Sequence, residues 1–447
     1  MAALQDPAAL LETVLKRATR LGASAADAVL VEHTGLSVPY RLGRSEGIER
    51  SESTDLGLRV FSGHRQAIVS TTDLSPASLD TLAERAIAMV KTVPEDSYCG
   101  IADPEQLVRE WPDLDLAETV EPSPETLMAE AKSAEAAALA VEGVTNSEGA
   151  EAGWQRNAIT LLGTNGFHGQ YAVTRSGIAV SVLAGTGTAM ERDYEYASVL
   201  HREDLESPEA IGKRAGERAV KRLRPRKVPS AAIPIVYEPR VANSLLSHFA
   251  SAINGAAIAR GTSFLKDCMG KRIFPEGVSI VDDPHRARGL ASKPFDGEGV
   301  RNQRRYLVKD GVLETWLLDL RSARQLGLAS TGHAARGVSS PPSPASTNLY
   351  LEPGKISRES LLGDIEAGFL VTELIGMGVN GVTGDYSRGA AGFWIEKGEI
   401  AYPVSEVTVA GNLREMFQNV TAANDLEFRR GTDAPTLRVD GMMLAGV

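Results

Sequence analysis

One pattern occurs twice in the first half of the chain and constrains the fold more than any other sequence feature. Strand-like sequence is followed by Asp73-Leu74-Ser75-Pro76 in one copy and by Asp204-Leu205-Glu206-Ser207-Pro208 in the other. Serine before proline is typical of a helix start, because serine caps the first turn and proline fits the first helical position. We therefore predict a duplicated unit of strands followed by a helix, which makes a domain with internal pseudo-symmetry rather than a solenoid.

The other elements of this half follow from apolar periodicity and turn residues. An amphipathic helix is predicted at 7–21, and further helices at 76–90 and 124–141. Short β-type runs separated by turns predict an antiparallel meander, with strands at 28–33, 38–41, 56–61 and 67–70.

The second half is predicted to be mainly β. A linker at 223–230 is followed by a strand at 233–237, a long helix from about residue 240 to 259, and a Gly- and Pro-rich region. Strands are predicted there at 278–281, 305–308, 312–318, 347–351, 369–375, 392–395, 399–402 and 407–409. A chain of 447 residues exceeds what one hydrophobic core usually supports. The fold class is therefore α+β, with an N-terminal α+β domain (1–225) and a C-terminal barrel- or sandwich-like domain (226–447).

Charge and cysteine content limit the partners and the compartment. The 47 Lys and Arg residues against 58 Asp and Glu residues give a net charge of −11, which disfavours direct binding of nucleic acid. The basic run 221–227 is short and lies beside prolines, so we interpret it as part of a solvated linker. Cys99 and Cys268 are far apart and form no CxxC motif. We expect a cytoplasmic protein without disulfides or a signal peptide.

The common catalytic motifs are missing or incomplete. Gly376-Met377-Gly378-Val379-Asn380-Gly381 matches GxGxxG, but we predict that a loop follows at 382–389 where a dinucleotide site requires a helix. The seven histidines show no i,i+3 or i,i+4 pair. We interpret Asp282-Asp283-Pro284-His285 as a turn after a strand and His333 as an exposed loop residue. No autonomous catalytic or metal site is predicted.

The helix predicted at 241–259 is the most informative segment. It contains no charged residue, yet it is too polar to span a membrane. Its apolar residues recur at i,i+4 on one face, and small polar residues gather on the other. The polar residues are Ser244, Ser247, His248, Ser251 and Asn254. Such a face could line a groove for extended peptide, or it could pack on neighbouring backbone, and the pattern does not separate these alternatives.

Five short segments carry a resemblance that covers nearly the whole chain. They are Asp73-Leu74-Ser75-Pro76, Tyr237-Glu238-Pro239-Arg240-Val241-Ala242 leading into Leu245-Leu246-Ser247-His248, Ala259-Arg260-Gly261-Thr262-Ser263-Phe264-Leu265, Thr347-Asn348-Leu349-Tyr350-Leu351, and Gly384-Asp385-Tyr386-Ser387-Arg388-Gly389-Ala390-Ala391-Gly392. With these segments the chain resembles the TldD/PmbA family, formerly described as modulators of DNA gyrase. Within it, the chain is most similar to the PmbA branch, also called TldE.

The resemblance also indicates what this chain lacks. In the TldD branch, the corresponding helix carries HExxxH, whose histidines bind zinc and whose glutamate serves as general base. In the matching register this chain has Ser247 and Ala252 in place of the histidines and His248 in place of the glutamate. The TldD branch uses a further cysteine near the C-terminus, whereas this chain has none after Cys268.

The resemblance implies a cytosolic, non-metal subunit of a metallopeptidase complex. Zinc is then expected on a TldD-like partner, with no cofactor on this chain, and the complex would cleave unfolded peptides in precursor maturation or antitoxin degradation. Ser247, His248, Ser251 and Asn254 are the candidates for the wall of a substrate chamber, with Arg260 near a peptide carbonyl or carboxylate. The alternative is a non-catalytic homodimer that binds peptides or proteins. A gyrase-binding role has little physical support.

Overall fold

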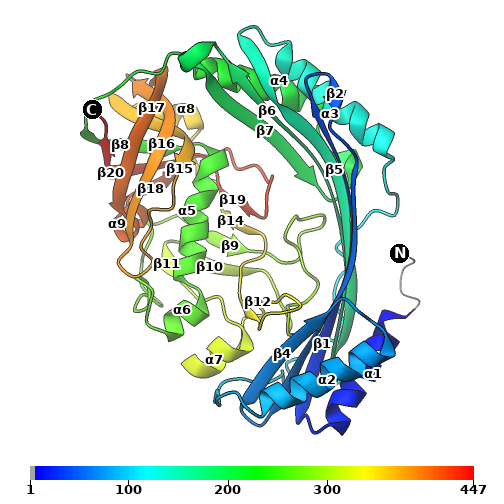
Figure 1. Cartoon of the computed structure of the whole chain (residues 1–447). Coiled ribbons are helices and arrows are strands. Elements are labelled where there is room, and N and C mark those ends of the chain that lie inside the picture. The colour runs from blue at the N-terminus through cyan, green and yellow to red at the C-terminus, as the bar shows by residue number, and fades with distance from the viewer. Residues whose placement is uncertain (1–5) are drawn as a thin grey trace.

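Two sheet systems dominate the computed structural model, which describes residues 6–447 (Figure 1). The first is a seven-stranded antiparallel sheet with the order β4-β3-β1-β5-β6-β7, with β2 paired to β1. Its strands are β1 (Ala25–Arg41), β2 (Arg44–Ser45), β3 (Glu49–Ser62), β4 (Arg65–Thr71), β5 (Val144–Gly163), β6 (His168–Ala184) and β7 (Glu191–Val199). The α+β class predicted from the sequence is confirmed.

Four helices cover one face of this curved sheet (Figure 1). They are α1 (Pro7–Arg20), α2 (Pro76–Val90), α3 (Pro124–Leu139) and α4 (Pro208–Lys221). Helices α1 and α2 share one hydrophobic core with one end of the sheet, and α3 and α4 share another core with the opposite end. In both copies of the predicted repeat, Ser75 and Ser207 cap the helix and proline follows at its first position.

The strands are longer than the sequence pattern predicted. Residues 28–33 and 38–41 belong to the single 17-residue strand β1, not to two strands of a meander. The strand continues through its polar middle because it is paired on both sides: Gly35 lies opposite Ser51 of β3 and Gln155 of β5. Backbone pairing in a central strand therefore outweighs the weak strand preference of Gly35.

The second half contains a closed five-stranded barrel, which is one of the two architectures, barrel or sandwich, that the sequence predicted. Its strands are β8 (Ala231–Tyr237), β15 (Ala367–Ile375), β16 (Asp385–Glu396), β17 (Glu399–Asn412) and β20 (Leu437–Ala445). They pair in the order β17-β16-β15-β8-β20, and β20 pairs back to β17. Strand β18 (Val420–Ala422) extends the sheet beyond β20. The two short strands predicted at 399–402 and 407–409 are one strand, β17.

A smaller sheet and several short elements complete this half. The sheet has the order β11-β10-β9-β14-β19. Its strands are β9 (Ile280–Asp282), β10 (Arg305–Lys309), β11 (Val312–Leu313), β14 (Leu349–Leu351) and β19 (Thr432–Asp433), and β12 (Ala334–Ala335) pairs with β13 (Ser343–Pro344). The predicted strand 312–318 is reduced to β11, because Asp319 then caps α7 (Leu320–Leu326) with a capping box. Helices α8 (Arg358–Leu362) and α9 (Leu413–Gln418) flank the barrel.

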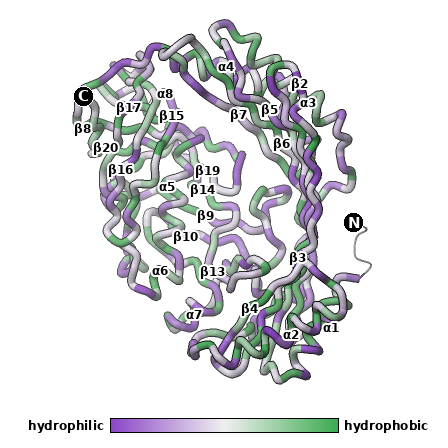
Figure 2. Tube along the Cα trace, viewed as in Figure 1, coloured by the Kyte–Doolittle hydropathy of each residue, from purple (hydrophilic) through white to green (hydrophobic). Residues whose placement is uncertain are grey.

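The segment between α4 and β8 joins the two halves. The predicted domain boundary at 225/226 lies in this segment, but the division into two domains stays a prediction. Three side chains of the basic run contact acidic or aromatic groups: Arg222 lies 2.5 Å from Glu373, Lys227 pairs with Glu406, and Arg226 stacks on Tyr402. Hydrophobic and hydrophilic residues are mixed along the trace in both halves (Figure 2). No helix within residues 6–447 is long and apolar enough to cross a membrane.

Candidate functional site

Helix α5 (Pro239–Ala252) passes between the barrel and the smaller sheet. Its apolar residues Val241, Leu245 and Phe249 recur at i,i+4 and are buried in the largest core of the chain. Ser247 and Ser251 lie on the opposite side and are exposed. The amphipathic pattern predicted from the sequence is therefore present, with Ser247 and Ser251 towards solvent and Ser244 and His248 half-buried.

The predicted continuation of this helix to Ala259 is wrong. Helix α5 ends at Ala252, and a separate helix α6 (Gly255–Ala259) begins after Asn254. The Asn254 side chain accepts hydrogen bonds from the backbone N–H groups of Ala256 and Ala257, which starts the new helix. Gly255 donates its N–H to Leu317 O at 2.8 Å instead of continuing α5. The break is thus fixed by a neighbouring segment far away in sequence.

The serine hydroxyls on the polar face bond to their own helix. Ser244 donates to Val241 O at 2.6 Å, Ser247 to Asn243 O at 3.2 Å and Ser251 to Ser247 O at 2.9 Å. A hydroxyl that donates to the preceding turn keeps its lone pairs, so these groups can accept a hydrogen bond from a ligand N–H.

His248 is half-buried beside the aromatic ring of Tyr386. Its ring lies edge-on to Tyr386 with 5.9 Å between the ring centroids, and its Nε2 has no hydrogen-bond partner within the described residues. Burial lowers the pKa of His248, and the positive charge of Arg388 lowers it further. The imidazole is therefore neutral at pH 7, and its Nε2 is buried without a hydrogen-bond partner within the described residues, so a ligand reaches it only if the surrounding side chains move.

The other two predicted site residues lie around α6. Both polar groups of Asn254 are used by the fold, since its Oδ1 caps α6 and its Nδ2 donates to Pro344 O at 2.7 Å. Arg260 follows the last residue of α6 and is exposed, and its guanidinium makes no hydrogen bond or ion pair to residues 6–447. Of Asn254 and Arg260, it is therefore Arg260 whose side-chain N–H groups are free to donate hydrogen bonds to a ligand.

The donor set on α5 does not fit a zinc ion. Ser247 has a hydroxyl engaged with its own helix, Ala252 has no donor atom and is buried, and His248 is a single nitrogen ligand. Catalytic zinc uses three protein ligands drawn from His, Cys and carboxylates. Within residues 6–447, no group of three or more such side chains is arranged to hold a metal ion.

The glycine-rich segment 376–381 forms the turn system between β15 and β16. Residues 385–389, predicted as loop, are the first residues of strand β16. The turn is held because Ser387 N donates to Gly378 O at 2.7 Å and Gly384 N donates to Asn380 O at 2.8 Å. A strand follows where a dinucleotide site needs a helix N-terminus, so the interpretation as turn residues holds.

His333 is buried, contrary to the prediction of an exposed loop histidine. Its side chain is about 2% exposed, with Nε2 3.1 Å from Asp282 Oδ2 and Nδ1 2.7 Å from Thr331 Oγ1. Thr347 also donates its N–H and hydroxyl to Asp282, at 2.6 Å each. The segments around Asp282, His333 and Thr347 therefore form one hydrogen-bonded cluster, which no local pattern could show.

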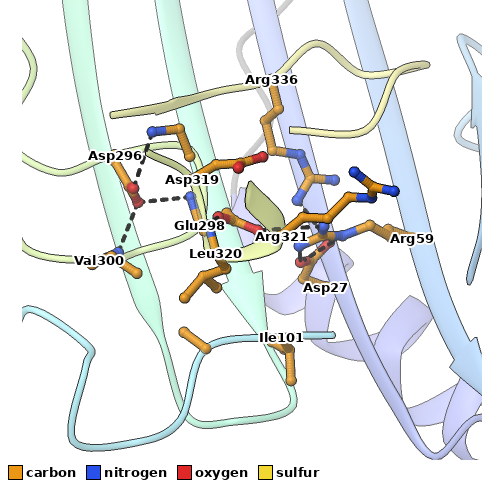
Figure 3. A network of polar contacts seen from close by, with 12 residues as sticks. Asp27, Arg59, Ile101, Asp296, Glu298, Val300, Asp319, Leu320, Arg321 and Arg336 are labelled. Atoms are coloured by element: carbon orange, nitrogen blue, oxygen red, sulfur yellow. Dashed lines mark hydrogen bonds and ion pairs between the residues drawn. The ribbon is translucent and has the colours of Figure 1, made fainter. Parts of the chain in front are cut away.

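A buried ionic network joins the first sheet to the second half (Figure 3). Asp27 of β1 pairs with Arg59 of β3 and, at 2.6 Å, with Arg336 from the segment after β12. Arg59 also lies 3.6 Å from Glu298, which accepts the Leu320 N–H at 2.9 Å. The acidic and basic side chains of this network are at most 6% exposed.

The pKa values of the carboxyl groups in and beside this network are shifted in opposite directions. Burial alone would raise the pKa of Asp27, but Arg336 and Arg59 together hold it below its usual value. Burial raises the pKa of Glu298 to about 8, against the attraction of Arg59 and with the help of the Asp296 charge. Asp296 accepts three backbone N–H groups, yet burial raises its pKa to about 6. Sequence reasoning missed this site, although charged residues within the apolar strands β1 and β3 signalled it.

The protein combines a curved, helix-covered sheet with a closed barrel. Helix α5 lies against the barrel, and its side chains do not form a zinc site. These features define the class as an α+β protein in which α5 carries no set of zinc ligands. The chain belongs to the PmbA/TldD family. The family models match as PmbA/TldA metallopeptidase domain 1 at 26–90, the central domain at 117–223 and the C-terminal domain at 230–446. It is thus a metalloprotease-related protein of this family.

Named relatives match over almost their full length. The chain is 39% identical to Metalloprotease PmbA of Escherichia coli O157:H7, covering 98% of this chain and 96% of that protein. It is 38% identical to a Metalloprotease PmbA homolog of Haemophilus influenzae, covering 96% and 94%. A crystal structure of a putative modulator of DNA gyrase from Bacteroides thetaiotaomicron has a TM-score of 0.90 at 28% identity and covers 98% of each chain. TldE from Thermococcus kodakarensis shares the fold, with a TM-score of 0.87 at 20% identity, covering 98% of this chain and 100% of that one.

Proposed function

We propose that this chain is the non-metal subunit of a metallopeptidase complex, in which a zinc-bearing TldD-like homologue supplies the catalytic centre. The observation that carries the proposal is the donor set on α5. The positions that match HExxxH hold Ser247, His248 and Ala252, which cannot hold catalytic zinc. The match to metallopeptidase family models over all three segments supports a role in proteolysis.

In this proposal the polar face of α5 contacts the peptide substrate. Ser247 and Ser251 offer hydroxyl lone pairs, neutral His248 offers one ring nitrogen, and exposed Arg260 offers a guanidinium. These groups match the N–H and C=O groups of an extended peptide backbone. Asn254 contributes by fixing the α5–α6 corner rather than by direct contact, because its amide is already bonded.

The test is a cleavage assay on unfolded peptides with three samples: this chain alone, a TldD-like partner alone, and both together. We expect cleavage to require the partner, to rise when this chain is added, and to stop when a chelator removes zinc. Native mass measurement should show a complex that contains both chains. Full, chelator-resistant activity of this chain alone would falsify the proposal, and a stable homodimer that ignores the partner would favour a peptide-binding regulator instead.

A further inference from the structure

A pocket of about 720 Å³ lies where the α4 end of the first sheet meets the barrel. It is lined from the sheet side by Asp193 of β7 and by Arg218 and Lys221 of α4, and from the other half by α8 and the strands β15–β17. Ligand pockets in proteins typically measure about 300–1,000 Å³. The pocket therefore has the size of a small-molecule or short-peptide site, and it lies at the α4 end of the sheet and the N-terminal end of α5.

The floor of this pocket is apolar. Leu370 of β15 and Leu362 of α8 are buried there, beside the half-buried ring of Phe393. Ile400 lies at the rim and is 46% exposed. An apolar floor with one exposed isoleucine at its edge would bind an aliphatic side chain and release ordered water.

Charges of both signs surround that floor. The lining basic side chains are Arg218, Lys221, Arg240, Arg358 and Lys397, and the acidic ones are Asp193, Glu238, Glu359 and Glu399. Arg218 is already bonded to Glu195, whereas Arg358 and Glu238 approach only to 3.8 Å. Lys221, Lys397 and Glu399 form no ion pair within residues 6–447. The pocket thus keeps cationic and anionic groups available to a ligand.

Arg240 gives a second, independent sign of a missing ligand. Its side chain is 7% exposed, bonds Asp193 at 2.9 Å through Nη1 and lies over the ring of Tyr194, 4.5 Å from the ring centroid, while its buried Nη2 has no hydrogen-bond partner within the described chain. A buried guanidinium nitrogen without a partner is costly, and a carboxylate would satisfy it. Arg240 also lies in the first turn of α5, where the positive end of the helix dipole favours an anion.

We propose that this pocket binds a short apolar peptide whose α-ammonium and α-carboxylate groups are both free. The carboxylate is held by Arg240 and Arg358, the ammonium by the carboxylates of Glu238 or Glu399, and an aliphatic side chain lies on the Leu362–Leu370 floor. A smaller cavity of about 210 Å³ shares Arg218, Glu238, Arg240 and Arg358 with the pocket, which leaves room for a longer peptide. The inference rests on the proposed function only in naming proteolysis as the source of such peptides.

Isothermal titration of the isolated full-length chain with the dipeptide Leu-Leu tests the proposal. We expect saturable binding, and no binding of N-acetyl-Leu-Leu-amide, which keeps the side chains and lacks both charges. Glycyl-glycine, which keeps the charges and lacks the side chains, should bind weakly. Because the variant removes a charged hydrogen bond, Arg358→Gln should weaken Leu-Leu binding about tenfold or more.

Three further variants locate the ligand. Glu399→Gln should weaken binding by removing a partner of the ammonium group, and Ile400→Asp should weaken it by placing a charge at the apolar rim. Lys266→Gln removes a charge from an exposed position outside the pocket and should leave binding unchanged. Circular dichroism confirms that each variant is folded.

Absence of Leu-Leu binding in the millimolar range would overturn the proposal. Equal binding of the capped peptide, or binding that none of the pocket variants weakens, would also overturn it. Because the titration needs no partner chain, failure here leaves the metallopeptidase complex untouched. Conversely, a failed cleavage assay would leave a positive titration intact.

Discussion

At the scale of single residues, the carboxyl group of Glu298 is buried next to Arg59, Asp296 and Asp319. Its pKa of about 8 lies above the ordinary value of 4.5, so the folded chain binds a proton that the unfolded chain releases. This contribution to stability is complete below pH 4.5 and is lost as pH rises through about 8.

We expect the melting temperature of the protein to fall between pH 6 and pH 9, and Glu298→Gln to remove most of that fall, because glutamine resembles the protonated acid. Calorimetry of both proteins across this range measures the difference. Glu276→Gln, at an exposed position, is the matched control. A variant that keeps the full pH dependence would show that Glu298 is already ionised in the folded protein.

His248 carries the corresponding prediction for activity. If its free nitrogen bonds the substrate, His248→Ala should lower the cleavage rate of the complex about fivefold, the effect of one neutral hydrogen bond of about 1 kcal/mol. The melting temperature should change little, because Nε2 has no partner to lose. His168→Ala, at an exposed position on β6, serves as control. An unchanged rate would assign the α5 face to packing alone.

At the scale of elements, Asn254 caps the start of α6 directly after α5 has ended. Asn254→Ala removes the cap of α6 and the bond to Pro344, and we expect a loss of about 1–2 kcal/mol in the free energy of unfolding. Asn243→Ala lies inside α5, where alanine has a higher helix propensity than asparagine, so this variant should not lower the free energy of unfolding. Denaturant unfolding of the two variants makes the comparison. Equal stability would mean that α6 needs no side-chain cap.

Helices were easier to predict than strands. Helix α2 is present with the predicted bounds, because serine caps and N-terminal prolines mark helix starts locally. Strands β1 and β17 were each predicted as two pieces, since a strand end depends on which strands lie beside it. The burial of His333 depends on the strand that carries Asp282, 51 positions earlier in the sequence.

At the scale of the whole molecule, the buried ion pairs around Asp27 connect one end of the first sheet to the second half. Asp27→Asn leaves buried Arg336 and Arg59 short of one negative charge, and removing one partner of a buried ion pair costs about 3–5 kcal/mol. We expect a lower melting temperature and a larger radius of gyration by small-angle X-ray scattering. Asp55→Asn on β3, outside the network, should change neither. A compact, equally stable Asp27 variant would show that packing alone holds this junction.

The sequence by itself determined the α+β class, the capped helices and the amphipathic helix at α5, because these depend on residues close together in the chain, and the family resemblance located the missing ligand positions. Only the tertiary structure decided the closure of the barrel, the end of α5, the buried network around Asp27 and Glu298, and the pocket beside Arg240. Each of these brings together segments far apart in sequence. The network and the pocket also join the two halves, so their buried charges and the unpartnered Arg240 nitrogen exist only once the halves are in contact.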